Sequence, residues 1–286
     1  MESTVALIGF GEAGSTFARA AGWGTAACGY DIDPAREPAM ADHGVRPGAS
    51  AAEAVRDAPI VLSLVTADAA LAAARDYAPL LAPGTIWCDM NSVAPQTKRE
   101  ACEAVTAAGG RYVDCAILAP VQPGALAVPL LLAGQAAADA VTMLAALGFT
   151  NLRVVGDEVG RASTIKLCRS VAVKGIEAIC AEMALAAARA GVLDEVLASL
   201  DASEKPQSWA QRVDYNLDRM LLHGRRRSAE MFEASEMLRD LGIAPLVTDG
   251  TVQWQEGIGE LGIAPPAGLA AKLEAIVQSP EFKGEI

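Results

Sequence analysis

The sequence predicts an α/β domain with a parallel sheet, followed by an all-α domain built on a long central helix. In the first half of the 286 residues, short apolar β-type runs alternate with Ala-rich helical stretches, which is typical of a parallel sheet covered by helices. From Val159 to about Ala190 the chain has no proline and no strand-like alternation, which predicts one long helix. At about 150 residues per domain the length favours two domains, expected at 1–157 and 158–286.

The individual elements are predicted from apolar runs, helical periodicity and turn residues. Strands are expected at 4–8, 25–30, 59–64, 85–89, 111–116, 129–133 and 152–155. Helices of the first domain are expected at 12–23, 35–43, 50–57, 67–79, 94–108 and 136–146. Helices of the second domain are expected at 159–190, 193–201, 206–222, 225–241, 246–260 and 266–277, with breaks at Gly191, Gly224, Gly242 to Pro245, and Pro265 to Pro266.

Composition limits the classes of partner. An apolar share of 52% and a mean hydropathy of +0.27 exclude a disordered chain. The net charge of −12 leaves no broad basic surface for nucleic acid or an anionic membrane, so a small-molecule partner is expected. Six cysteines without a CxxC pair and two histidines predict no metal site and favour a reducing cytoplasm. The first apolar run, Val5 to Ile8, is too short for a signal-peptide core or a membrane span.

The segment from Val5 to Ala21 is an apolar strand that runs into a GxGxxG motif and then into a helix. Gly9 permits the tight turn, Gly11 lets the backbone approach a pyrophosphate, and Gly14 lets the helix pack closely. This order of strand, glycine turn and helix predicts a Rossmann-type dinucleotide-binding domain. The expected cofactor contacts in the turn are Gly9, Phe10, Gly11, Glu12, Ala13 and Gly14.

A second apolar strand ends on Asp31, about 20 residues after the glycines, where a carboxylate accepts hydrogen bonds from an adenosine ribose. Because a carboxylate repels a 2′-phosphate, NAD is favoured over NADP. Arg36 lies near enough in the sequence to leave NADP open.

Two later strand ends are expected to face the same crevice, because ligands of open α/β sheets bind beyond the carboxyl ends of the strands. Leu64, Val65, Thr66 and Asn91 are the expected cofactor contacts there, and Ser92 is an expected substrate contact. The alternative is that Asn91 or Ser92 only caps the helix that follows.

The chain resembles the β-hydroxyacid dehydrogenases, which include 3-hydroxyisobutyrate dehydrogenase and the NAD-binding part of 6-phosphogluconate dehydrogenase. The GFGEAG turn, the YDIDP segment, the DMNS segment from Asp89 and the lysine-bearing helix from Gly160 occur in the family's order and spacing. The resemblance is closer to a branch in which a helical domain of unknown function follows the nucleotide domain.

The resemblance implies that Lys166, in the Gly160 to Lys166 segment, does acid-base work beside the nicotinamide. An independent argument is that a lysine within an apolar helix beside a cleft loses hydration, which favours the neutral amine that can accept a proton. The alternative is a lysine that snorkels to solvent. Ser170 stands where the family commonly has a substrate-holding asparagine, and its i, i+4 spacing puts it on the face of Lys166.

Two segments depart from the family. The substrate-holding Ser-Gly-Gly is absent from 114–122, where Ala119 and Gln122 are the expected substrate contacts. The Lys-Asp-Leu segment is replaced by residues 229–231, and one turn earlier stands the cluster from His223 to Arg227. This cluster is either a solvated helix start paired with acidic side chains, or an anion clamp in which His223 and Arg226 reach the substrate from a second subunit.

The sequence therefore predicts an NAD-dependent oxidoreductase that moves a hydride between nicotinamide and the alcohol or carbonyl of a small acid, with NADP not excluded. One alternative is an imine reductase, for which a lysine at position 166 is unusual. The other is a non-catalytic NAD-binding sensor. A homodimer or higher homo-oligomer through the helical domain is expected.

Overall fold

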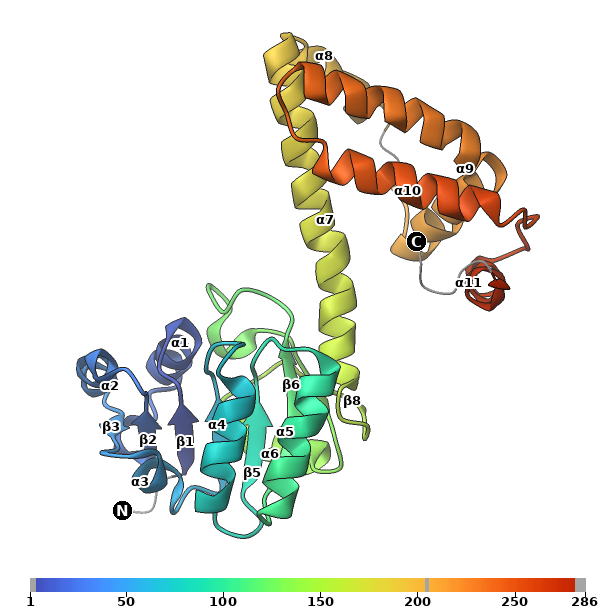
Figure 1. Ribbon diagram of the computed structural model, residues 1–286. Helices are drawn as coiled ribbons and strands as arrows, with labels where there is room; N and C mark the ends of the chain where they lie inside the picture. Colours follow the sequence, from blue (N-terminus) through green and yellow to red (C-terminus); the bar gives the residue numbers. More distant parts are fainter. Residues whose placement is uncertain (1–3, 204–205, 281–286) are drawn as a thin grey trace. The chain divides into compact units, whose positions relative to one another are not determined.

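The computed structural model describes residues 4–203 and 206–280 and confirms the predicted fold class (Figure 1). The chain divides into two compact units, with the boundary between Ser170 and Val171. The first unit contains a sheet covered by helices, and the described part of the second unit is helical.

The first unit is built on an eight-stranded sheet in the order β3-β2-β1-β4-β5-β6-β7-β8. The strands are β1 (Val5–Ile8), β2 (Ala27–Tyr30), β3 (Arg46–Pro47), β4 (Ile60–Ser63), β5 (Ile86–Asp89), β6 (Arg111–Ile117), β7 (Leu130–Ala133) and β8 (Leu152–Gly156). All neighbours pair in parallel except β6 and β7, which are antiparallel. The sequence did not predict β3, because a two-residue edge strand that contains a proline leaves no alternating pattern.

Helices cover both faces of this sheet because successive strand residues point to opposite sides. On β1, Val5 and Leu7 belong to one apolar cluster, whereas Ala6 and Ile8 belong to the other. The helices are α1 (Glu12–Ala21), α2 (Glu37–Asp42), α3 (Ala51–Val55), α4 (Ala70–Tyr77), α5 (Pro95–Ala107) and α6 (Ala137–Ala146), with 3-10 turns at Gly24–Ala26, Pro34–Arg36, Ala78–Leu80 and Ala125–Ala127. α1 and α6 join the first cluster, and α3, α4 and α5 join the second.

The order of strands reverses between β1 and β4, which are neighbours although β2 and β3 separate them in the sequence. In open α/β sheets such a switch point leaves a crevice beyond the carboxyl ends of the two strands. The glycine turn after β1 and the segment after β4 therefore meet at one place.

The second unit consists of helices. α7 (Arg161–Ala190) begins in the first unit and continues into the second, and it is followed by α8 (Leu193–Ser203), α9 (Trp209–Asp240), α10 (Leu246–Glu260) and α11 (Leu269–Gln278). α10 packs along α9, and Leu221, Ile258 and Ile276 form the small apolar core of α9, α10 and α11.

The predicted break between helices 206–222 and 225–241 was wrong, because α9 is continuous through Gly224. Gly224 is buried where α9 crosses α10. A Cβ at this position would lie 2.2 Å from the carbonyl oxygen of Gln255 and 2.7 Å from Cα of Gly259. The glycine therefore permits two helices to approach closely and does not end one.

No helix within the described residues has the length and apolar character needed to cross a bilayer. Among the same residues, no group of three or more histidine, cysteine or acidic side chains is arranged to hold a metal ion.

Candidate functional site

The glycine turn between β1 and α1 forms a cradle for an anion. Gly9 has a φ of +93°, and a Cβ there would lie 2.6 Å from the carbonyl oxygen of Leu64. A Cβ at Gly14 would lie 2.7 Å from the carbonyl oxygen of Gly9. At Gly11 nothing lies within 4 Å of that position, so the space is open, and α1 has no side-chain cap. The first amides of α1 therefore remain suited to bind a phosphate.

A cavity of about 430 Å³ opens at this turn. It is lined by seven of the predicted cofactor residues: Gly9, Gly11, Glu12, Asp31, Leu64, Val65 and Thr66. Asp31 is anchored, because its Oδ2 accepts a hydrogen bond from the Phe10 amide at 2.6 Å and its Oδ1 accepts one from the Asp33 amide at 2.9 Å. The Phe10 side chain is buried in the core, and its backbone amide contacts the cavity residue Asp31.

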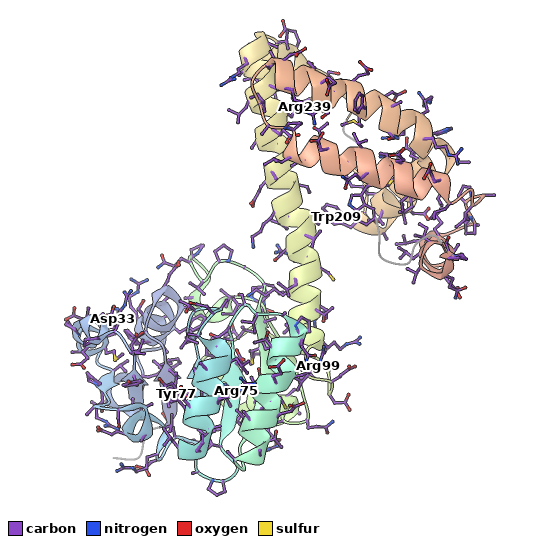
Figure 2. All side chains as sticks on the ribbon, viewed as in Figure 1. Asp33, Arg75, Tyr77, Arg99, Trp209 and Arg239 are labelled. Carbon is purple, nitrogen blue, oxygen red and sulfur yellow. The ribbon has the colours of Figure 1, made fainter. Side chains whose placement is uncertain are left out.

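Asp76 and Tyr77, at the end of α4, are among the cavity residues that sequence reasoning did not include. The Tyr77 ring, labelled with Asp33 in Figure 2, meets Tyr30 edge to face with centroids 6.0 Å apart. Burial raises the pKa of the Tyr77 phenol, so it remains a neutral donor at physiological pH. An aromatic residue on the helix after β4 is the sequence signal that points to this wall of the cavity.

Ser92 and Lys166 come together although 74 residues separate them in the sequence. Lys166 Nζ donates a hydrogen bond to Ser92 Oγ at 2.5 Å. Ser92 lies three residues after the end of β5, and Lys166 is half-buried on the second turn of α7. The contact places a nitrogen base and a hydroxyl at the carboxyl edge of the sheet.

Asn91 is buried beside this pair. Its Nδ2 donates to Ser63 Oγ at 2.9 Å and to Asp89 Oδ1 at 2.8 Å, whereas its Oδ1 is a buried acceptor without a hydrogen-bond partner among the described residues. This oxygen can therefore accept a hydrogen bond from a further donor.

Lys98, on α5, was not predicted and is completely buried with Asp89 and Asp114. The signal in the sequence is its helical spacing, because the buried residues of α5 are Lys98, Ala101 and Val105. A lysine on the core-facing side of a helix indicates a buried carboxylate partner.

The remaining predicted substrate residues lie on different elements of the two units. Ser170 is half-buried at the end of the first unit, and Ala119 is exposed after β6. Gln122 Nε2 donates to Thr16 Oγ1 of α1 at 3.3 Å. His223 and Arg226 lie on α9 in the second unit, where Arg226 forms an exposed ion pair with Glu230.

Comparisons with known proteins agree with this geometry. The model of the NAD binding domain of 6-phosphogluconate dehydrogenase matches residues 4–149, and a domain of unknown function, DUF1932, matches residues 187–258. The structure of a conserved hypothetical protein from Sinorhizobium meliloti 1021 has 35% sequence identity and a TM-score of 0.61, with 96% of each chain covered.

Two further structures cover most of the chain. A conserved protein of unknown function, described as structurally similar to 3-hydroxyacid dehydrogenases, has 28% identity and a TM-score of 0.58, covering 95% of this chain and 98% of its own. An imine reductase from Myxococcus stipitatus, in complex with NADP+, has 18% identity and a TM-score of 0.71, covering 90% and 94%. At that identity the likeness shows the fold.

The cradle at Gly11, the anchored Asp31 and the cavity between them fit an NAD(P) cofactor. The sequence match covers the whole of this cradle and extends through β7 and α6. The chain therefore belongs to the family of the NAD binding domain of 6-phosphogluconate dehydrogenase, and its C-terminal part carries the domain of unknown function DUF1932.

Proposed function

We propose that the protein is an NAD-dependent oxidoreductase that interconverts the alcohol and carbonyl of a small acid, with Lys166 as the acid-base residue. The observation that carries the proposal is the contact between Lys166 Nζ and Ser92 Oγ at the carboxyl edge of the sheet that also bears the cofactor cavity. A base, a hydroxyl and a nucleotide cradle on one edge are the groups that alcohol oxidation requires.

The bound nicotinamide would accept or supply the hydride. In oxidation, the neutral Lys166 amine takes the proton of the substrate hydroxyl, and in reduction the ammonium returns that proton to the carbonyl oxygen. Ser92 Oγ accepts a hydrogen bond from Lys166, which orients the nitrogen, and its own proton remains available to the substrate. Ser170, one turn further along α7, is the second hydroxyl assigned to substrate or amine.

The charges around the adenosine end of the cavity support NAD over NADP. Asp31, Asp33 and Asp76 all line it, and a 2′-phosphate would be repelled by them. Arg36 is the arginine of this wall, and it pairs with Asp33 at 3.5 Å. Its charge is therefore partly offset by a neighbouring acid.

The acid specificity of the proposal rests on the positive cluster His223 to Arg227 of α9. A planar guanidinium binds a carboxylate through two parallel hydrogen bonds, which suits Arg226 or its neighbours to this task. We assign the cluster to a substrate site completed by a second copy of the chain, with 1–157 as the NAD(P)-binding domain and 158–286 as the substrate and dimerisation domain.

The α7 surface supports a homodimer. Residues 171–181 are all exposed, and they include the apolar side chains of Val171, Val173, Ile176 and Ile179. A long helix with exposed apolar side chains favours association with another copy. The free cysteines Cys168 and Cys180 on the exposed surface of this helix suit the reducing cytoplasm that we propose as its compartment.

The test is the absorbance of reduced nicotinamide with the natural chain and Lys166→Ala, using 3-hydroxy acids, sugar acids, 3-hydroxy amino acids and cyclic imines with NAD and NADP separately. We expect one hydroxy-acid class to react with NAD and Lys166→Ala to lower kcat by about 10²–10⁴-fold with NAD affinity unchanged. Arg153→Ala removes an exposed cation of β8 that lies outside both the cofactor cavity and residues 171–181, so it is the control and is expected to keep its turnover.

Full turnover in Lys166→Ala would remove this residue from its role. Activity confined to cyclic imines would identify an imine reductase instead. Tight NAD binding without turnover on any substrate would identify an NAD-binding sensor.

A further inference from the structure

Lys98 holds two carboxylates together inside the first unit. Its Nζ donates to the Asp89 carbonyl oxygen at 2.6 Å and to Asp89 Oδ1 at 2.9 Å, and it lies 3.6 Å from Asp114 Oδ1. The exposed fractions of the three side chains are 0%, 1% and 0%. An ion cluster this deeply buried loses hydration on every member, so it persists only where hydrogen bonds compensate that loss.

Asp89 connects this cluster to the segment that carries Ser92. Its Oδ1 accepts hydrogen bonds from the Asn91 amide at 3.0 Å and from Asn91 Nδ2 at 2.8 Å, and its Oδ2 accepts one from the Tyr112 hydroxyl at 2.6 Å. Burial and the nearby Asp89 raise the pKa of Tyr112 well above its ordinary value, so the phenol stays a donor. The backbone immediately before Ser92 is therefore tied to Asp89.

Asp114 connects the same cluster to the helix that carries Lys166. Its Oδ2 accepts hydrogen bonds from the Gly160 amide, the Ser163 amide and Ser163 Oγ, at 3.1, 3.1 and 3.2 Å. Its Oδ1 has no hydrogen bond among the described residues and faces Lys98 as an ion pair. One oxygen thus anchors the first turn of α7, and the other anchors Lys98.

The positions of the two aspartates explain why a cation is needed between them. Asp89 and Asp114 are partners in the parallel register of β5 and β6, so their side chains leave the same face of adjacent strands. Two neighbouring carboxylates repel each other in a low-dielectric interior. Lys98 offsets this repulsion and fixes the spacing of both groups.

We propose that Lys98 is a positioning residue for the Ser92–Lys166 pair, acting through Asp89 on the Ser92 segment and through Asp114 on the first turn of α7. The expected effect on turnover rests on the proposed function, in which Lys166 is the acid-base residue. The ammonium of Lys98 contacts Asp89 and Asp114, so its effect is on the distance and angle between the two segments that these aspartates hold.

The test uses the full chain labelled with ε-¹³C-lysine, in which six lysines give six signals. The Lys166 signal is assigned as the one lost in Lys166→Ala. In the natural chain, Ser92→Ala is expected to move that signal, because it removes a contact of the amine. In Lys98→Met the signal is expected to have moved already, and Ser92→Ala in this background should move it little further. Lys272→Met, which removes another buried lysine, should leave the response to Ser92→Ala intact.

An undiminished response to Ser92→Ala in folded Lys98→Met would overturn the proposal. If Lys98→Met does not fold, the double variant Lys98→Met/Asp114→Asn replaces it, because it removes one charge of each sign. The amide oxygen introduced at position 114 can still accept hydrogen bonds from the first turn of α7. A diminished response to Ser92→Ala in this variant supports the proposal, and an undiminished response overturns it.

Turnover gives the second measurement. We expect Lys98→Met to lower kcat by about 10²-fold, as a displaced catalytic group does. Unchanged kcat would contradict the positioning role. Because the Lys166 signal is read without substrate, it tests the positioning of the pair even if Lys166→Ala shows that the proposed reaction is wrong.

Discussion

Within the described residues, both units contain a buried lysine between two aspartates, but the two clusters have different roles. The side chain of Lys98 and its two partners are almost completely inaccessible, whereas Lys272 is 3% exposed and its partners Asp214 and Asp218 are 34% and 38% exposed. Asp214 and Asp218 lie one turn apart on α9 and tie α11 to it. The aspartates of Lys98 instead accept hydrogen bonds from the backbone of two segments of the candidate site.

The difference teaches that the same chemistry can serve packing in one place and site geometry in another. The role of each cluster depends on what its aspartates contact besides the lysine. The side chains of Asp214 and Asp218 are open to solvent, whereas Asp89 and Asp114 accept hydrogen bonds from other parts of the first unit.

The largest expected effect is the loss of folding stability when Lys98 is removed. Lys98→Met leaves two buried carboxylates without their cation, and it is expected to lower the free energy of unfolding by about 3–5 kcal/mol. Lys272→Met should lower it much less, because water can solvate Asp214 and Asp218. Urea denaturation of both variants followed by circular dichroism measures the difference. Equal losses would show that burial of the carboxylates does not distinguish the two clusters.

The next effect tests how the second unit packs. Gly224→Ala is expected to lower the free energy of unfolding by about 1–3 kcal/mol, because its Cβ would meet the backbone of α10. Gly250→Ala is the matched control on α10, where nothing lies within 4 Å of the added Cβ, and it should stabilise by about 0.5–1 kcal/mol. Thermal unfolding of both variants gives the comparison. A neutral Gly224→Ala would mean that α9 and α10 can separate without loss.

The smallest effect is on alkaline stability. Burial raises the pKa of Tyr112 well above the ordinary value of 10.0, so its phenol stays protonated in the folded chain while the unfolded chain ionises. The unfolded state then binds fewer protons, and the stability due to Tyr112 is complete below pH 10.0 and is lost as the pH rises above it.

Tyr112→Phe should therefore flatten the fall in stability above pH 10.0, by up to about 1.4 kcal/mol per pH unit, although it also removes the hydrogen bond to Asp89 at every pH. Tyr77→Phe is the control, because the pKa of Tyr77 is raised less strongly. Denaturant titrations between pH 8 and pH 11.5 measure both slopes. An unchanged slope in Tyr112→Phe would assign the alkaline loss to other groups, such as Lys272, whose pKa is raised by its hydrogen bond to Asp214.

Much of this protein could be predicted from local patterns. The apolar runs predicted each strand except β3, and the limits of α10 agree with the predicted 246–260. The glycine turn and Asp31 could be predicted because β1, the turn, α1 and β2 follow one another directly in the chain. Helical period, strand alternation and turn chemistry act between near neighbours, and these the sequence determines by itself.

The tertiary structure decided what depends on residues far apart in the chain. Gly224 has the residue type of a helix end, but the approach of α10 gives it a different use. Lys98 looks like an ordinary helical lysine until β5 and β6 bring Asp89 and Asp114 together beneath α5. Ser92 and Lys166 meet because the sheet places the end of β5 beside the start of α7. Burial and electrostatic pairing are properties of the packed chain, and no local pattern contains the partner that a distant strand or helix supplies.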